Sequence, residues 1–115
     1  MVASEFKSAY IASKHGIVGF TKTIALEGAP FGITANAICP GYVKTPLVEK
    51  QIADQAKAHN MSESDVVSKV MLLKQAVKDF VSVEELGQLA VFLASDIAKT
   101  MTGTALPVDG GWNAQ

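Results

Sequence analysis

Tyr10 and Lys14 are the two residues whose types and spacing best suit chemistry. Four positions apart on a helix, they would share one face. A free phenol ionises only near pH ~10, but an ammonium about 5 Å away favours the phenolate by roughly 3 kcal/mol at an effective dielectric of about 20. The pair therefore predicts a tyrosine that works as a general base near neutral pH. The plain alternative is an amphipathic helix whose tyrosine is half in the core.

The segment that carries this pair has helical periodicity. Apolar residues recur three or four positions apart over residues 8–27, and Pro30 with Gly32 ends the pattern. Gly16 and Gly19 interrupt the helix, which indicates either the close approach of another helix or simple tolerance of two glycines.

Two short apolar runs predict strands. Residues 33–39 lie between Gly32 and Pro40, and we expect them to be buried on both faces of a parallel sheet. Residues 104–108 form the second run and lead into a Gly-rich turn. Two parallel strands alone do not make a stable sheet, so the pattern predicts that the chain is part of a larger fold.

The segment between the strands predicts a lid. A helix is expected from Pro46 to about His59, and another from Ser62, whose spacing to Asp65 resembles a capping box. Ligands of open α/β sheets lie beyond the carboxyl ends of the strands, where an insertion at 46–80 would cover them. We therefore expect one domain, 1–115, with this lid. A clearer capping box, Ser82 with Glu85, predicts a further helix.

Composition excludes several classes of function. The net charge is -1, and all ten basic residues are lysines scattered among eleven acids, which argues against nucleic-acid binding. No apolar run approaches a membrane span and no signal peptide is visible, so we expect a cytoplasmic protein without a membrane partner. One cysteine and two histidines predict no disulfide and no metal site. Cys39 reads as a small buried hydrophobe more than as a nucleophile.

Four motifs in a fixed order carry a family resemblance. These are Tyr10–Lys14, Asn36–Gly41, Thr102-Gly103 and Val108–Gly111, and together they resemble the C-terminal half of short-chain dehydrogenases/reductases. The resemblance implies an α/β fold, the C-terminal part of a Rossmann-like doubly wound parallel sheet. It also implies that the N-terminal half, with the Gly-rich pyrophosphate turn and the catalytic serine, would precede Met1.

Within that family the chain is most similar to the bacterial 3-hydroxybutyrate dehydrogenases. The matching segments are Phe6–Tyr10, Cys39–Val43, Thr45–Gln51 and Asp109–Trp112. The resemblance implies an NAD-dependent oxidoreductase of ketone-body metabolism that interconverts 3-hydroxybutyrate and acetoacetate as a homotetramer. This chain would be a C-terminal fragment, inactive alone. One departure is Ala76, where the subfamily predicts proline.

The resemblance also implies a role for individual residues. Tyr10 would be the general base, and Lys14 would assist it and hold the nicotinamide ribose. The loop around the nicotinamide would include Pro40, Gly41, Val43 and Thr45, whose plain alternative is an ordinary strand-to-helix turn. The substrate would contact Lys7, Gln51 and Trp112, whose alternatives are a solvated lysine, a surface glutamine and an aromatic plug.

Two other functions stay open at this stage. One is a related reductase that acts on a carrier-bound or other 3-oxo substrate. Residues that bind a free carboxylate would distinguish a 3-hydroxybutyrate dehydrogenase from such a reductase. A non-catalytic chain could instead associate with full-length subunits through its helices. The choice between NAD and NADP also stays open, because the residue that makes it would precede Met1.

Overall fold

The computed structural model describes residues 3–115 as two compact units. One unit combines residues 3–39 with Gly87–Pro107, and the other combines Pro40–Leu86 with Val108–Gln115. No helix within residues 3–115 has both the length and the apolar character needed to cross a membrane.

The first unit begins with the predicted helix. Helix α1 spans Ser8–Gly28 and continues into the 3₁₀ turn η1, Ala29–Phe31. The chain then turns at Gly32, whose φ of 71° is the left-handed conformation that glycine adopts without strain. The predicted helix and its end signal are confirmed. No atom beyond the neighbouring helical backbone lies within 4 Å of a Cβ built on Gly16 or Gly19 in the described chain, so these glycines accommodate no close neighbour there.

Strands β1, Ala37–Pro40, and β2, Ala105–Val108, form a two-stranded parallel sheet in the described chain. The Ala37 N–H donates to the Thr104 carbonyl at 2.9 Å at the start of the pair, and the Gly41 N–H donates to the Val108 carbonyl at its end. The two strands therefore run in the same direction. The prediction of a first strand over 33–39 was wrong in its start, because pairing begins only at Ala37. The prediction of burial on both faces was also wrong, since Cys39 is half-buried and Pro40 exposed. Strand β1 pairs with only one other strand in the described chain, so its two faces are incompletely covered.

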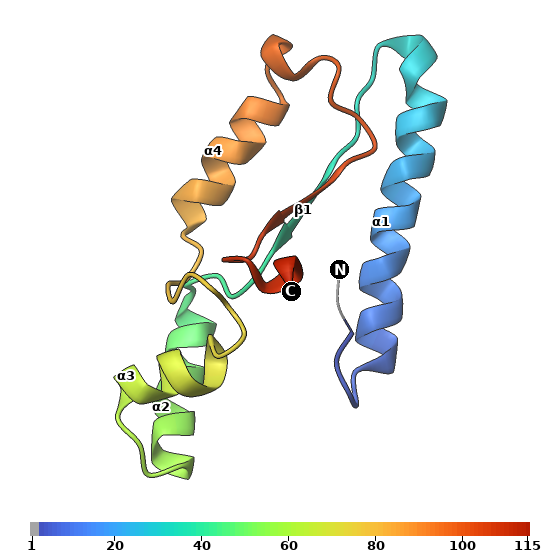
Figure 1. Cartoon of the computed structure of the whole chain (residues 1–115). Coiled ribbons are helices and arrows are strands. Elements are labelled where there is room, and N and C mark those ends of the chain that lie inside the picture. The colour runs from blue at the N-terminus through green and yellow to red at the C-terminus, as the bar shows by residue number, and fades with distance from the viewer. Residues whose placement is uncertain (1–2) are drawn as a thin grey trace. The chain divides into compact units, whose positions relative to one another are not determined.

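Helix α4, Val83–Leu93, begins at the predicted capping box, and both reciprocal bonds are present. The Ser82 N–H donates to a Glu85 carboxylate oxygen at 2.7 Å, and the Glu85 N–H donates to Ser82 Oγ at 3.0 Å. Beyond α4 lies the 3₁₀ turn η3, Asp96–Ala98. Within the first unit, α1 and the later turns of α4 lie on opposite sides of the strand pair (Figure 1).

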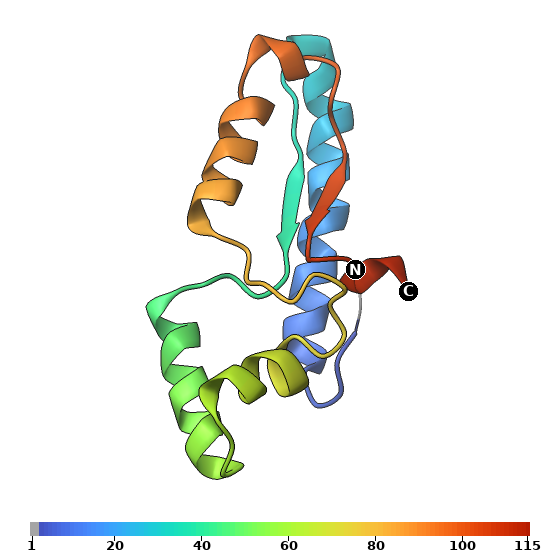
Figure 2. The ribbon, with the colours of Figure 1, turned by 60° about the vertical axis from the view of Figure 1, so that its left-hand side comes forward.

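The second unit contains the segment predicted as a lid. Helix α2 spans Pro46–Ala58, as predicted, and lies beside α3, Glu63–Val66 (Figure 2). Ser62 begins α3, because its Oγ accepts the Asp65 N–H at 3.1 Å. The helix then widens into a π-turn, η2, Val67–Met71. The function of 46–80 as a lid stays a prediction.

The core of the second unit lies between these helices. Val66 and Leu72 are fully buried, and burial of such side chains stabilises a fold by about 1.5–3 kcal/mol each. Partly buried neighbours complete this core, among them Tyr42, Val48 and Phe80. A parallel bridge between Val43 and Val81 ties the segment after β1 to the segment before α4. The chain ends in the 3₁₀ turn η4, Trp112–Ala114.

Candidate active site

Tyr10 and Lys14 lie one turn apart on α1 and face each other. The Lys14 ammonium nitrogen is 5.4 Å from the centroid of the Tyr10 ring. At an exposed site this cation–π geometry stabilises by about 0.5–1 kcal/mol. The tyrosine is 57% exposed in this chain, so its phenol can meet a ligand. The structure thus brings the predicted pair together.

Lys7 lies immediately before α1 and is its N-cap residue. Its carbonyl accepts the Ile11 N–H at 2.8 Å, while its side chain makes no capping bond and is exposed. The preceding Phe6 has a φ of 61° and a fully exposed ring. Ser13 Oγ donates to the Tyr10 carbonyl at 2.8 Å, so this hydroxyl is used by the main chain.

The loop after β1 contains the predicted cofactor-binding residues. Pro40 ends β1, and the Gly41 N–H donates to the Val108 carbonyl at 2.9 Å. The Val43 bridge is made by its neighbours, because Val81 N–H donates to the Tyr42 carbonyl and Lys44 N–H to the Val81 carbonyl. The N–H and C=O of Val43 therefore face away from Val81.

Thr45 follows as the N-cap of α2. Its Oγ1 accepts the Val48 N–H at 3.3 Å, which leaves the hydroxyl hydrogen for another acceptor. Gln51 lies in the second turn of α2 and is exposed. Trp112 packs its ring against Tyr42, with centroids 6.3 Å apart and a tilt of 46°. This tilted geometry is favourable for an aromatic pair.

Asp109 fixes the turn that precedes Trp112. One carboxylate oxygen accepts the Gly111 N–H at 3.0 Å, and the other accepts the Asn113 N–H at 3.1 Å and its side-chain amide. Burial alone would raise the pKa of Asp109, but these hydrogen bonds outweigh it and lower the pKa below its ordinary value. The carboxylate therefore acts as a structural anchor.

The nine predicted site residues thus divide between the two units. The first unit holds Lys7, Tyr10 and Lys14, and the second holds Pro40, Gly41, Val43, Thr45, Gln51 and Trp112. Their assignment as a site stays a prediction. No cluster of three His, Cys, Asp or Glu side chains within residues 3–115 could bind a metal ion.

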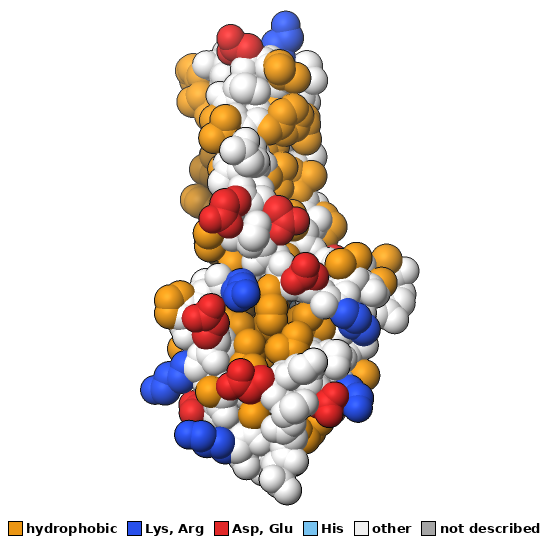
Figure 3. All heavy atoms as spheres, turned by 90° about the vertical axis from the view of Figure 1, so that its left-hand side faces the viewer, with side chains coloured by type: hydrophobic (Ala, Val, Ile, Leu, Met, Phe, Trp, Pro, Cys, Tyr) orange, Lys and Arg blue, Asp and Glu red, His pale blue; other side chains and the backbone are white. Residues whose placement is uncertain are grey.

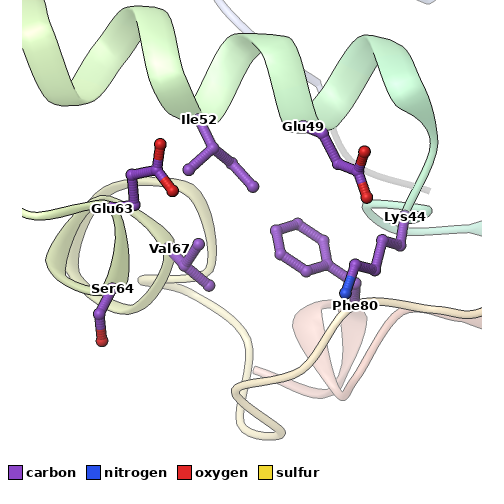
Figure 4. Close-up of a pocket in the computed structure, with 7 residues that line it drawn as sticks. All are labelled: Lys44, Glu49, Ile52, Glu63, Ser64, Val67 and Phe80. Carbon is purple, nitrogen blue, oxygen red and sulfur yellow. The ribbon is translucent and has the colours of Figure 1, made fainter.

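A hollow of about 400 Å³ lies in the second unit. Ile52, Val67 and Phe80 point toward one another on its floor, and charged side chains of both signs surround it (Figure 4). Figure 3 shows such a region, with hydrophobic side chains framed by acidic and basic ones. None of the predicted site residues lines this hollow, but its lining includes Lys44 and Glu49, which are close in sequence to Thr45 and Gln51.

Sequence reasoning missed one buried polar residue of the second unit. Gln75 is only 1% exposed and touches the segments around both Gly41 and Gly110. No periodicity or motif marks a buried glutamine in an irregular segment, and the two glycines beside its amide, Gly41 and Gly110, are more than thirty residues away on either side.

Comparison with known proteins identifies the class. The model of a family described as enoyl-(acyl carrier protein) reductase matches residues 1–113. The chain belongs to the short-chain dehydrogenase/reductase family, as its motifs predicted. It is 57% identical over 115 residues to a D-beta-hydroxybutyrate dehydrogenase of Rhizobium meliloti and 52% identical to one of Cupriavidus necator. Each match covers 100% of this chain and 45% of the relative, so the chain spans about half the length of these relatives.

Solved structures agree on the fold. A short-chain dehydrogenase family protein from Francisella tularensis superposes with a TM-score of 0.88 at 34% identity, covering 100% of this chain and 47% of that one. Actinorhodin polyketide ketoreductase with NADPH (TM-score 0.83, 32% identity) covers 99% of this chain and 43% of that one. 4-Hydroxyisoleucine dehydrogenase with NADH superposes with a TM-score of 0.77 at 30% identity, covering 94% of this chain and 40% of that one. The predicted fold class, the C-terminal part of a Rossmann-like α/β sheet, is confirmed.

Proposed function

We propose that this chain supplies the catalytic base and the substrate-binding side of an NAD-dependent 3-hydroxybutyrate dehydrogenase. The reaction removes a hydride from the carbon that bears the hydroxyl and a proton from its oxygen, which gives acetoacetate. The juxtaposition of Tyr10 and Lys14 on an exposed face of α1 carries the proposal. The 57% identity to a D-beta-hydroxybutyrate dehydrogenase over the whole chain supports the choice of substrate.

The residues of the second unit suit a nicotinamide cofactor, which would supply the hydride acceptor. A carboxamide needs both an acceptor and a donor, and the main chain of Val43 offers one of each because its bridge uses neither. The Thr45 hydroxyl keeps a hydrogen to donate. Pro40 and Gly41 would lie beside the ring. Of two structures similar to this chain, one contains NADH and the other NADPH, so the choice of NAD follows the relatives and not the loop.

Tyr10 takes the hydroxyl proton in this proposal. The ammonium of Lys14 stabilises the phenolate electrostatically and donates to the ribose hydroxyls. Because a lysine has three hydrogens to donate, it can serve both partners from one position.

The substrate carboxylate needs a cation and an amide, and its short carbon chain needs an apolar wall. Lys7, beside the start of α1, would supply the cation, and Gln51 on α2 the amide. Trp112, fixed by the Asp109 turn and the Tyr42 ring, would supply the wall. A neutral ester of the same acid would lose the interactions with Lys7 and Gln51.

A chimera tests this function directly. The N-terminal part of the Rhizobium meliloti relative that this chain does not match is joined ahead of residue 1, and reduction of NAD by D-3-hydroxybutyrate is followed by absorbance. We expect turnover with the D acid and at least about tenfold weaker activity with its methyl ester, since a charge-assisted pair is lost. A folded, NAD-binding chimera without turnover on the acid would refute the substrate. Failure to bind NAD or NADP would refute the class of reaction.

A reductase of 3-oxo substrates is the second candidate. The specific observation in its favour is 44% identity over 102 residues to a putative ketoacyl reductase of monensin polyketide synthase from Streptomyces virginiae, a match that covers 89% of this chain and 39% of that relative. The same chimera decides between them, because a ketoacyl reductase prefers the neutral ester over the free acid.

The assembled protein would be a homotetramer in the cytoplasm, without nucleic-acid or membrane partners. Exposed apolar side chains on α1, Ile17 and Phe20 among them, support association with further protein surface. Sedimentation of the chimera tests the oligomeric state.

A further inference from the structure

Gln75 is one of two polar side chains that are buried within residues 3–115, Asp109 being the other. Its amide nitrogen donates to the carbonyls of Val77 and Asp79, each at 3.1 Å. These two acceptors use both amide hydrogens and so fix the orientation of the side chain. The amide oxygen, Oε1, has no hydrogen-bond partner in the described chain and is fully covered. A buried acceptor without a partner is costly, so the position of this group requires an explanation.

Two glycines make room for the Gln75 amide. A Cβ on Gly41 would lie 3.2 Å from Oε1, and one on Gly110 would lie 2.6 Å from the amide nitrogen. Gly110 also has a φ of 61°, which an L side chain rarely adopts. The glutamine is therefore wedged between the residue that follows β1 and the turn that follows β2.

Hydrogen bonds connect the segment around Gln75 both to the turn at Gly110 and, through Val81, to Val43. The N–H groups of Ala76 and Val77 both donate to the Gly110 carbonyl at 2.9 Å. Proline at position 76 would lack the first of these donors, so the departure from the subfamily pattern adds a bond here. On the other side, the Asp79 carbonyl held by Gln75 lies two residues before Val81, which bridges to Val43.

We propose that Gln75 is a positioning residue that sets two parts of the site together. One part is the segment 41–45, with Val43 and Thr45, and the other is the turn that carries Trp112. The proposal rests on the function proposed above, which assigns the first part to the cofactor and the second to the substrate. One buried amide would thus control both binding surfaces without touching either ligand.

The test compares Michaelis constants in the chimera. Gln75→Met keeps the length of the side chain and removes its hydrogen bonds. We expect it to raise KM for NAD and for 3-hydroxybutyrate about tenfold each, the factor that corresponds to one or two ordinary hydrogen bonds, with kcat within about threefold. Thr45→Ala should raise only the first KM, and Trp112→Ala only the second.

Leu72→Ala is the matched control, because Leu72 is 0% exposed in the same unit and has no proposed contact with a ligand. It should lower the melting temperature at least as much as Gln75→Met and leave both KM values within about twofold. If Gln75→Met lowers the melting temperature but changes neither KM, or only one of them, the positioning role is wrong.

Amide hydrogen exchange provides a readout that needs no activity. In Gln75→Met we expect faster exchange in both 41–45 and 109–112, whereas in Leu72→Ala faster exchange should centre on α2 and α3. Acceleration confined to 75–79 would overturn the inference. Failure of the positioning role is distinguishable from failure of the proposed function, because hydrogen exchange can be measured in a chimera that is folded but inactive.

Discussion

Replacing Lys14 by methionine removes the ammonium and keeps most of the side-chain length. The Lys14 ammonium nitrogen lies 5.4 Å from the centroid of the Tyr10 ring. At that distance it would attract a unit negative charge by about 0.8 kcal/mol in water and by about 3 kcal/mol at an effective dielectric of 20. These limits correspond to a loss in rate of about fourfold to 150-fold. Because Tyr10 is 57% exposed in this chain, a site left open to water should lie near the lower limit and a covered site near the upper one.

The assay measures kcat of the chimera together with KM for NAD. Loss of the cation beside Tyr10 should lower kcat, and loss of a ribose contact should raise KM for NAD. Lys14→Arg keeps the charge and should retain most of kcat. A deficit in kcat that is equal in Lys14→Arg and Lys14→Met would refute the electrostatic role.

Four further outcomes are expected. Tyr10→Phe should lower kcat at least about a hundredfold with a nearly unchanged dissociation constant for NAD, and near-normal turnover would remove Tyr10 as the base. Lys7→Ala, Gln51→Ala and Trp112→Ala should each raise KM for 3-hydroxybutyrate and not for NAD; a cofactor defect would place them in the wrong pocket. Asp109→Asn should cost about 1–2 kcal/mol of stability at pH 7. The native pKa of Asp109 is lowered, so this difference in thermal stability should persist above pH ~4 and vanish as the pH falls through the native pKa; a difference independent of pH would contradict the anchor. The 115-residue polypeptide by itself should neither bind NAD nor oxidise the acid, and saturable binding in calorimetric titration would contradict this.

Local signals in the sequence predicted the elements that depend on local bonds. The end of α1 follows from Pro30 and Gly32, and the start of α4 follows from Ser82 and Glu85, because each feature is made by residues within a few positions of one another. The spacing of Tyr10 and Lys14 likewise sufficed to predict their contact on one helix face.

Features that depend on distant parts of the chain were not predictable in the same way. The first strand was expected to be buried on both faces, but burial depends on neighbours, and β1 has one neighbour strand in the described chain. Gln75 shows the same limit in the site. Gln75 is buried because Gly41 and Gly110 pack against its amide, and nothing in the sequence near Gln75 indicates that these two glycines are its neighbours. A residue that positions others through space is therefore found from the structure, whereas the proposed contact residues follow from the spacing of Tyr10 and Lys14 and from the family resemblance of the motifs. This difference makes the paired changes in KM the decisive measurement, because a contact residue should affect one ligand and a positioning residue both.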